Sequence, residues 1–174
     1  MGRLIIKRLH HEVSDTFSCG NASIDSQIRQ SYFESLAGII SAFEILSDKE
    51  DCIGYTALQM KSIHPEDFPS DIGDIDIGRV FTFYAVEIKF LAVNHYMQGQ
   101  RIGTAVLEIF KKLLLSHHKT MPFCFIYVDA LAERKSWYTK HGFIPFEDTE
   151  CETRVTIPMY LDLVDRSALL EYLT

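Results

Sequence analysis

The sequence lacks paired cysteine motifs, long apolar runs and lipidation signals. Its four cysteines lie far apart, at Cys19, Cys52, Cys124 and Cys151, and form no C-x-x-C pair. Without such pairs and without a signal peptide, we expect free thiols in a reducing cytoplasm. The longest apolar runs are shorter than the ~20 residues that a membrane-spanning helix needs, so no membrane association is expected.

Positive charge is also scarce. The chain has 17 lysines and arginines against 24 acidic residues, a formal net charge of −7 and a pI near 5.4. This balance argues against broad, non-specific binding of nucleic acid, although it leaves room for a local basic patch. With 174 residues, 47% of them hydrophobic, the chain is long enough for one globular domain with a substantial core.

The first half of the sequence predicts a strand, a helical region and a β-hairpin. Residues 4–9 form the strand candidate, and 10–19 are polar and irregular. Asn21 or Ser23 is the expected N-cap of one or two amphipathic helices that extend to about residue 36. The apolar positions with helical spacing are Ile24, Ile28, Tyr32, Phe33 and Leu36. Apolar runs at 39–46 and 52–60, separated by polar residues, predict the hairpin, and 64–78 is expected to be a surface loop.

The second half predicts alternating strands and helices. A nearly continuous apolar run at 80–93 is typical of a central strand. The helix that follows is expected to bury the side carrying Ile102, Ala105, Val106, Ile109, Phe110, Leu113 and Leu114. A strand at 123–128, a short helix at 134–141 ending at Gly142, strands at 143–146 and 154–163, and a helix at 167–173 complete the prediction. This order predicts one mixed α/β sheet with helices on both faces.

The stretch 86–107 reads as a buried strand, a turn with two glycines and a helix. Unpaired backbone N–H groups and the helix dipole make such a turn a site for a phosphate or pyrophosphate. It is not a P-loop, because no G-K-[ST] follows the glycines, and it lacks the G-x-G-x-x-G dinucleotide pattern. On this evidence alone, a plain strand–helix connection fits equally well.

Two motifs together resemble a known family. Leu91-Ala92-Val93, a spacer and Gln98-Gly99-Gln100-Arg101-Ile102-Gly103-Thr104 resemble the acetyl-CoA-binding motif Q/R-x-x-G-x-G/A of the GNAT N-acetyltransferases. Trp137-Tyr138-Thr139-Lys140-His141-Gly142-Phe143 resembles the family's F-Y-x-x-x-G-F signature.

The resemblance covers residues 39–163. It implies a single GNAT domain over 1–174, with a mostly antiparallel sheet of about six or seven strands. The acetyl-CoA segment is expected at 86–107 and the C-terminal catalytic segment at 123–163. The expected ligand is acetyl-CoA, held by Leu91, Ala92, Val93, Gln98, Gly99, Gln100, Arg101, Ile102, Gly103 and Thr104, with no metal.

Arg101 departs from the family pattern, which usually has glycine there. We expect a side chain at this position to require an ordinary φ angle. The guanidinium is then expected to point away from the pyrophosphate, or toward it as an added cation.

The segment from Phe17 to Asp25 narrows the resemblance. Its residues F-S-C-G-N-A-S-I-D are similar to the F-x-C-G-N-x-x-[IL]-[DN] opening of a branch that contains toxins of toxin–antitoxin pairs. Those toxins acetylate the amino group of aminoacyl-tRNA. The resemblance therefore allows tRNA, a small antitoxin protein and a second copy of the chain as partners. A tRNA surface would have to use Lys7, Arg8, Arg29, Lys89, Arg101, Lys111, Lys112, Arg134, Lys135 and Lys140.

For acetyl transfer to a primary amine in a ternary complex, the resemblance makes Tyr138 the acid that protonates the thiolate. A core tyrosine that only packs the helix is the alternative. The N–H groups of Leu91 and Val93 are expected to hold the pantetheine arm and polarise the acetyl carbonyl. Glu87 is the candidate base, through a water, although Lys89 is expected closer to the acetyl group. An equally good interpretation of Glu87 is an exposed, solvated glutamate at the strand end with no catalytic role.

Other residues are weaker candidates. Cys19 lacks an identifiable histidine partner, so a buried thiol is expected rather than a nucleophile. The adjacent pairs at His10-His11 and His117-His118 diverge, which disfavours metal binding. A non-catalytic acyl-CoA-binding module remains an alternative to an enzyme.

Overall fold

The computed structural model describes residues 3–64, 82–146 and 155–163. Seven strands form one sheet in the order β1-β2-β3-β4-β5-β7-β6. The β1/β2, β2/β3, β5/β7 and β6/β7 pairs are antiparallel and β4/β5 is parallel, which confirms the mixed, mostly antiparallel sheet. Most of the expected loop at 64–78, the expected helix at 167–173 and Cys151 lie outside the described residues.

The chain divides into two compact units, Met1–Gln59 with Ile88–Leu113, and Met60–Glu87 with Leu114–Thr174. The strands β3 (Cys52–Ile63) and β4 (Phe83–Val93) contribute residues to both. A single domain over the whole chain stays a prediction.

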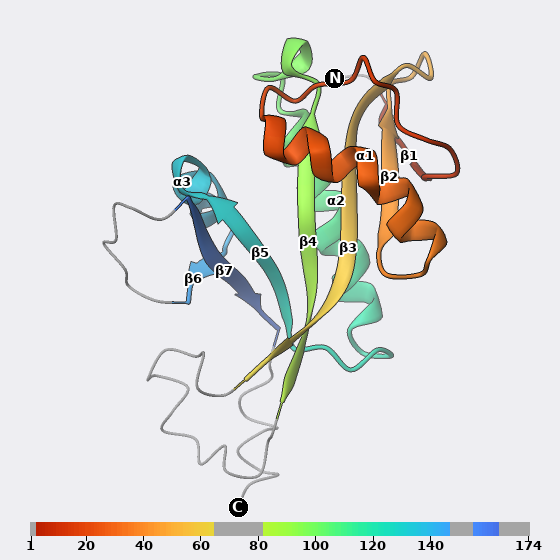
Figure 1. Ribbon diagram of the computed structural model, residues 1–174. Helices are drawn as coiled ribbons and strands as arrows, with labels where there is room; N and C mark the ends of the chain where they lie inside the picture. The colour runs from red at the N-terminus through yellow and green to blue at the C-terminus, as the bar shows by residue number, and fades with distance from the viewer. Residues whose placement is uncertain (1–2, 65–81, 147–154, 164–174) are drawn as a thin grey trace, which may run out of the picture. The chain divides into compact units, whose positions relative to one another are not determined.

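In the first unit, helices cover both faces of the strands. The strands are β1 (Ile5–Arg8), β2 (Ser41–Leu46) and the adjoining parts of β3 and β4. Figure 1 shows α1 (Ala22–Leu36) crossing in front of these strands, while α2 (Ile102–His117) runs behind them.

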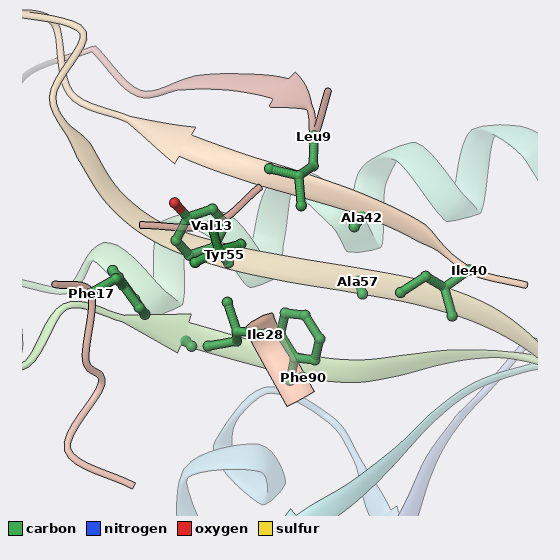
Figure 2. Packing of buried hydrophobic residues seen from close by; sticks show 10 residues of the cluster. Leu9, Val13, Phe17, Ile28, Ile40, Ala42, Tyr55, Ala57 and Phe90 are labelled. Carbon is green, nitrogen blue, oxygen red and sulfur yellow. The ribbon is translucent and has the colours of Figure 1, made fainter. Parts of the chain in front are cut away.

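The two faces of these strands have separate apolar clusters. Figure 2 shows the α1 side, where Ile28 lies among Phe17, Tyr55 and Phe90. On the α2 side, Val106 and Phe110 belong to a second cluster with residues of β2, β3 and β4. Each helix is therefore fixed by the apolar side chains of one sheet face.

Helix α1 begins where its capping residue predicts, but its buried face differs from the expected one. Asn21 is the N-cap, and its side-chain oxygen accepts the N–H groups of Ser23 at 3.1 Å and Ile24 at 3.2 Å. Phe33 and Leu36 share the helical spacing of the apolar positions but are 58% and 69% exposed, so this spacing does not mark the buried face. Ser31 and Ser35 are buried instead, and the Ser31 hydroxyl donates to the carbonyl of Ile28 at 2.6 Å.

Helix α2 also carries more apolar residues than it buries. Ile102, Val106, Leu107, Phe110 and Leu114 are buried. The predicted burial of Ile109 and Leu113 is wrong, because these side chains are 42% and 41% exposed. The buried stripe follows i, i+4 spacing, and the helix has a second apolar stripe that the sheet does not cover.

The second unit contains the end of β3 and the start of β4 together with the C-terminal elements. These are β5 (Phe125–Leu131), η4 (Ala132–Arg134), α3 (Lys135–Lys140), β6 (Ile144–Pro145) and β7 (Thr156–Asp162). Phe125 is at the centre of this unit's core, with ring centroids 5.8 Å from Phe83 and 5.6 Å from Tyr160. In the described parts of the chain, no helix is both long and apolar enough to cross a membrane.

Candidate active site

The turn between β4 and α2 has the backbone shape of an anion-binding site. It begins with η3 (His95–Met97), where the Asn94 side chain accepts the N–H of Tyr96 at 3.1 Å. Gly99 follows at φ +78°, Arg101 at φ +61°, and α2 starts at Ile102. Two left-handed residues, separated only by Gln100 and directly ahead of a helix of 16 residues, are a backbone arrangement that favours anion binding.

Arg101 corrects the expectation of an ordinary φ angle. Its φ of +61° lies in the left-handed region that glycine adopts freely. The turn therefore imposes on Arg101 a conformation that glycine adopts without strain, and the arginine carries that strain. The Arg101 side chain is exposed.

Gln98 connects this turn to the N-terminal segment. Its side-chain Nε2 donates to the carbonyl of Cys19 at 2.8 Å and to the carbonyl of Val93 at 3.1 Å. Both N–H donors of the amide are thus engaged by backbone carbonyls. The Gln98 side chain therefore holds the turn in place, and the expected contact of Gln98 with the cofactor stays a prediction.

The other expected cofactor residues on β4 and α2 divide into core and surface positions. Ala92 and Val93 are buried, and Leu91 is half-buried against the α2-side cluster. Ile102 is buried in the same cluster, so only its backbone is suited to a ligand. The half-exposed and exposed positions are Gly99, Gln100, Gly103 and Thr104.

Strands β3 and β4 lie very close together next to these residues. A Cβ atom added to Gly54 would lie 2.4 Å from the carbonyl oxygen of Ala92. The hydroxyl of Thr56 donates to the carbonyl of Phe90 at 2.8 Å. These contacts fix the course of β4 as it enters the turn.

In the second unit, Tyr138 lies buried on α3. Its ring contacts those of Trp137 and Phe143, with centroids 4.7 Å and 5.4 Å away. Burial raises the pKa of Tyr138 to about 12, and the nearby charge of Arg134 lowers it by less. Helix α3 ends at Lys140 with His141 as its C-cap, and the predicted Gly142 follows with φ +90° and donates its N–H to the carbonyl of Thr139.

Glu87, in the same unit, is buried and belongs to a charged cluster. It is 7% exposed, which contradicts the alternative of an exposed glutamate at the strand end. Lys61 Nζ lies 3.8 Å from Glu87 Oε2, 3.6 Å from Asp129 Oδ2 and 3.8 Å from the centroid of the Tyr127 ring. The Tyr127 hydroxyl donates to Asp129 Oδ1 at 2.6 Å. The sequence did not single out Lys61, because only the pairing of β3 with β4 brings it next to Glu87.

Several other expected residues are engaged in structural contacts. Lys89 Nζ bonds both carboxylate oxygens of Glu34, at 2.9 and 3.1 Å. Burial, and secondarily a hydrogen bond with Asp25, raise the pKa of the Cys19 thiol to about 11, which makes it a poor nucleophile. Within residues 3–64, 82–146 and 155–163, no group of three or more His, Cys, Asp or Glu residues is placed to hold a metal ion.

Four of the basic residues that a tRNA surface would use form ion pairs with glutamates of the chain. Lys7, Lys89, Lys111 and Arg134 lie 2.9 to 3.8 Å from carboxylate oxygens, those of Glu50, Glu34, Glu108 and Glu133.

No protein-family model matches the chain, and no curated protein matches it either. Solved structures do match over nearly the whole length. AtaT in complex with acetyl-methionyl-tRNAfMet is 18% identical, with a TM-score of 0.72, over 98% of this chain and 99% of that one. A tyrosine-to-phenylalanine mutant of KacT is 18% identical, with a TM-score of 0.75, over 95% and 98%.

A third match is a tyrosine-to-phenylalanine mutant of the AtaT toxin, bound to the C-terminus of the antitoxin AtaR and to acetyl-CoA. It is 16% identical, with a TM-score of 0.71, over 98% of this chain and 99% of that one. The agreement in topology and length confirms the predicted fold: the chain has the GNAT fold that AtaT and KacT share.

Proposed function

We propose that this chain is an N-acetyltransferase that moves an acetyl group from acetyl-CoA to a primary amine in a ternary complex. The observation that carries the proposal is the turn at 98–101, where Gly99 and Arg101 are both left-handed ahead of α2. Such a turn suits a pyrophosphate. The proposal is supported by the fold shared with a toxin whose structure is described with acetyl-CoA.

In this proposal the two ends of acetyl-CoA meet different parts of β4 and the turn. The backbone of residues 98–104 receives the pyrophosphate, and the N–H groups of Leu91 and Val93 hold the pantetheine arm and the acetyl carbonyl. Ile102 contributes through its backbone only, since its side chain is buried in the core.

Tyr138 is the proposed acid. The amine nitrogen attacks the thioester carbonyl carbon, the C–N bond forms, the C–S bond breaks, and the departing sulfur takes a proton from the Tyr138 hydroxyl. A pKa of about 12 keeps this hydroxyl protonated throughout the physiological range. Glu87 is the proposed acceptor, through a water, of the proton that the amine loses, and Lys61 holds its carboxylate.

The amino group of aminoacyl-tRNA is a second candidate acceptor. It is favoured by the similarity to AtaT, which is described with acetyl-methionyl-tRNAfMet, and a small antitoxin protein is the corresponding partner. An aminoacyl ester has an amine of low pKa, so this acceptor needs no strong base. We place the activity in the cytoplasm, consistent with the free thiols of Cys19, Cys52 and Cys124.

The test is a thiol-release assay with acetyl-CoA and a panel of amines that includes charged tRNA. We expect Tyr138→Phe to lower kcat by roughly 10²- to 10⁴-fold while the Kd for acetyl-CoA stays unchanged. Tyr84→Phe is the matched control, because Tyr84 is 50% exposed on β4, and it should keep wild-type kcat.

Two outcomes would redirect the proposal. If acetyl-CoA binds but no amine is acetylated, the chain is a non-catalytic acyl-CoA-binding module. If charged tRNA is the acceptor, expression without an antitoxin should arrest growth. If an active enzyme is expressed without harm, charged tRNA is not the acceptor, and a small amine is the remaining candidate.

A further inference from the structure

Asp25 is a buried carboxylate that reaches back from α1 to the segment preceding it. It is 6% exposed, and its oxygens accept the Ser18 hydroxyl at 2.7 Å and the Cys19 N–H at 2.8 Å. The Ser18 hydroxyl oxygen in turn accepts the N–H of Gly20 at 3.1 Å. The carboxylate thereby fixes the loop 18–20.

The helix itself does not require this arrangement. Asn21 already caps α1 by accepting two of its first N–H groups. Burial alone raises the pKa of Asp25, but hydrogen bonds from the Cys19 N–H and the Ser18 hydroxyl, helped by the charge of Arg29, outweigh burial and leave the pKa lowered. Asp25 is thus held ionised by the loop.

The same loop holds the turn between β4 and α2. The Ser18 carbonyl accepts the backbone N–H of His95 at 3.0 Å and lies 3.1 Å from its Nδ1, and the Cys19 carbonyl accepts the Gln98 side chain at 2.8 Å. The fit is close, since a Cβ atom added to Gly20 would lie 3.7 Å from His95 Cβ. Both ends of η3 are therefore attached to the loop that Asp25 fixes.

We propose that Asp25 is a positioning residue for acetyl-CoA, acting through the loop 18–20 on the turn 98–101. Without the carboxylate, the Ser18 and Cys19 carbonyls lose their fixed positions, and His95 and Gln98 lose their anchors. The pyrophosphate N–H groups then have to be ordered when the ligand binds, which weakens binding without changing the chemical step. This inference rests on the proposed function of the turn.

The test compares Asp25→Asn with Asp15→Asn, which removes the same charge at an exposed position in the preceding segment. In Asp25→Asn the amide oxygen can still accept the Cys19 N–H, but the amide nitrogen cannot accept the Ser18 hydroxyl. We expect the Kd and the KM for acetyl-CoA to rise on the order of tenfold, the loss of about one hydrogen bond to a charged group, with kcat within about twofold of wild type. Asp15→Asn should match wild type in all three.

A second measurement does not depend on acetyl-CoA. Hydrogen exchange of the protein without ligand should show a faster-exchanging His95 amide in Asp25→Asn, while the Phe110 amide in the middle of α2 keeps its protection. Gln98→Ala combined with Asp25→Asn should weaken acetyl-CoA binding by less than the product of the two single effects, because both act through one chain of contacts. If Asp25→Asn does not fold, Ser18→Ala removes the same hydroxyl contact and takes its place.

The outcomes distinguish a failure of the positioning role of Asp25 from a failure of the proposed acetyl-CoA function. Unchanged Kd and unchanged His95 protection in a folded Asp25→Asn protein would overturn the positioning role. A fall in kcat with unchanged KM would overturn it as well, since the carboxylate would then affect the chemistry. Failure of the wild-type protein to bind acetyl-CoA would sink the proposed function, and unchanged His95 exchange would then still refute the link between Asp25 and the turn.

Discussion

Replacing Arg101 by glycine should stabilise the protein, which is unusual for the removal of a long charged side chain. At φ +61° an L-amino acid is disfavoured by about 1–2 kcal/mol, and glycine is not. Glycine loses roughly 0.5–1 kcal/mol through the greater freedom of its unfolded chain. The balance predicts that Arg101→Gly increases the free energy of unfolding by about 0.5–1 kcal/mol.

Arg101→Ala is the matched variant, because it removes the same side chain and keeps the φ strain. Urea unfolding of the two variants should show a higher midpoint for glycine at equal m-value, and its Tm should be higher by about 1–4 °C. Equal stability of the two variants would refute the left-handed assignment of this residue. Any change in acetyl-CoA affinity that both variants share measures the guanidinium itself, and no shared change would show that it points away from the pyrophosphate.

Three further predictions concern other parts of the chain. Gly54→Ala should lower the free energy of unfolding by about 3 kcal/mol, because the new methyl meets the carbonyl of Ala92, whereas Gly38→Ala, with open space around it and φ +73°, should cost about 1 kcal/mol. Denaturant unfolding measures both, and equal costs would contradict the close approach of β3 and β4. The folded pKa of Asp25 is lowered from 3.8, so the stabilisation by its carboxylate is present above that pH and is lost as the pH falls below it. The difference in free energy of unfolding between wild type and Asp25→Asn should therefore narrow only in acid. The tyrosinate absorbance that Tyr138→Phe removes should appear near pH 12, and its appearance near pH 10 would show that burial does not hold the proton.

The features that sequence predicted well are those set by neighbouring residues. Asn21 caps α1 because its side chain reaches N–H groups two and three residues ahead, and Gly142 ends α3 because a left-handed residue is needed there. The order of strands and helices followed from apolar periodicity for the same reason. These signals are local, so a single sequence contains them.

The features that sequence missed depend on contacts between distant residues or on small side chains. Ser31 and Ser35 lie on the buried face of α1, where an apolar pattern points instead to Phe33 and Leu36. Lys61 meets Glu87 only because strand pairing brings them together. The roles of Tyr138 and the turn in acetyl transfer stay predictions.

Gln98 and Arg101 show two further limits of local reasoning. The Gln98 side chain bonds the carbonyl of Cys19, 79 positions earlier in the chain. Residue type alone predicts an ordinary φ for Arg101, but the turn imposes the left-handed conformation on this residue.

The ion pairs of Lys7, Lys89, Lys111 and Arg134 have a consequence for any encounter with nucleic acid. A lysine that neutralises a phosphate releases condensed counterions and makes affinity fall steeply with salt. Here each of these cations already faces a carboxylate. If the chain binds tRNA, a phosphate has to displace a carboxylate from each of these four cations. These four residues should therefore contribute less to the slope of log K against log salt than the other six basic residues named above.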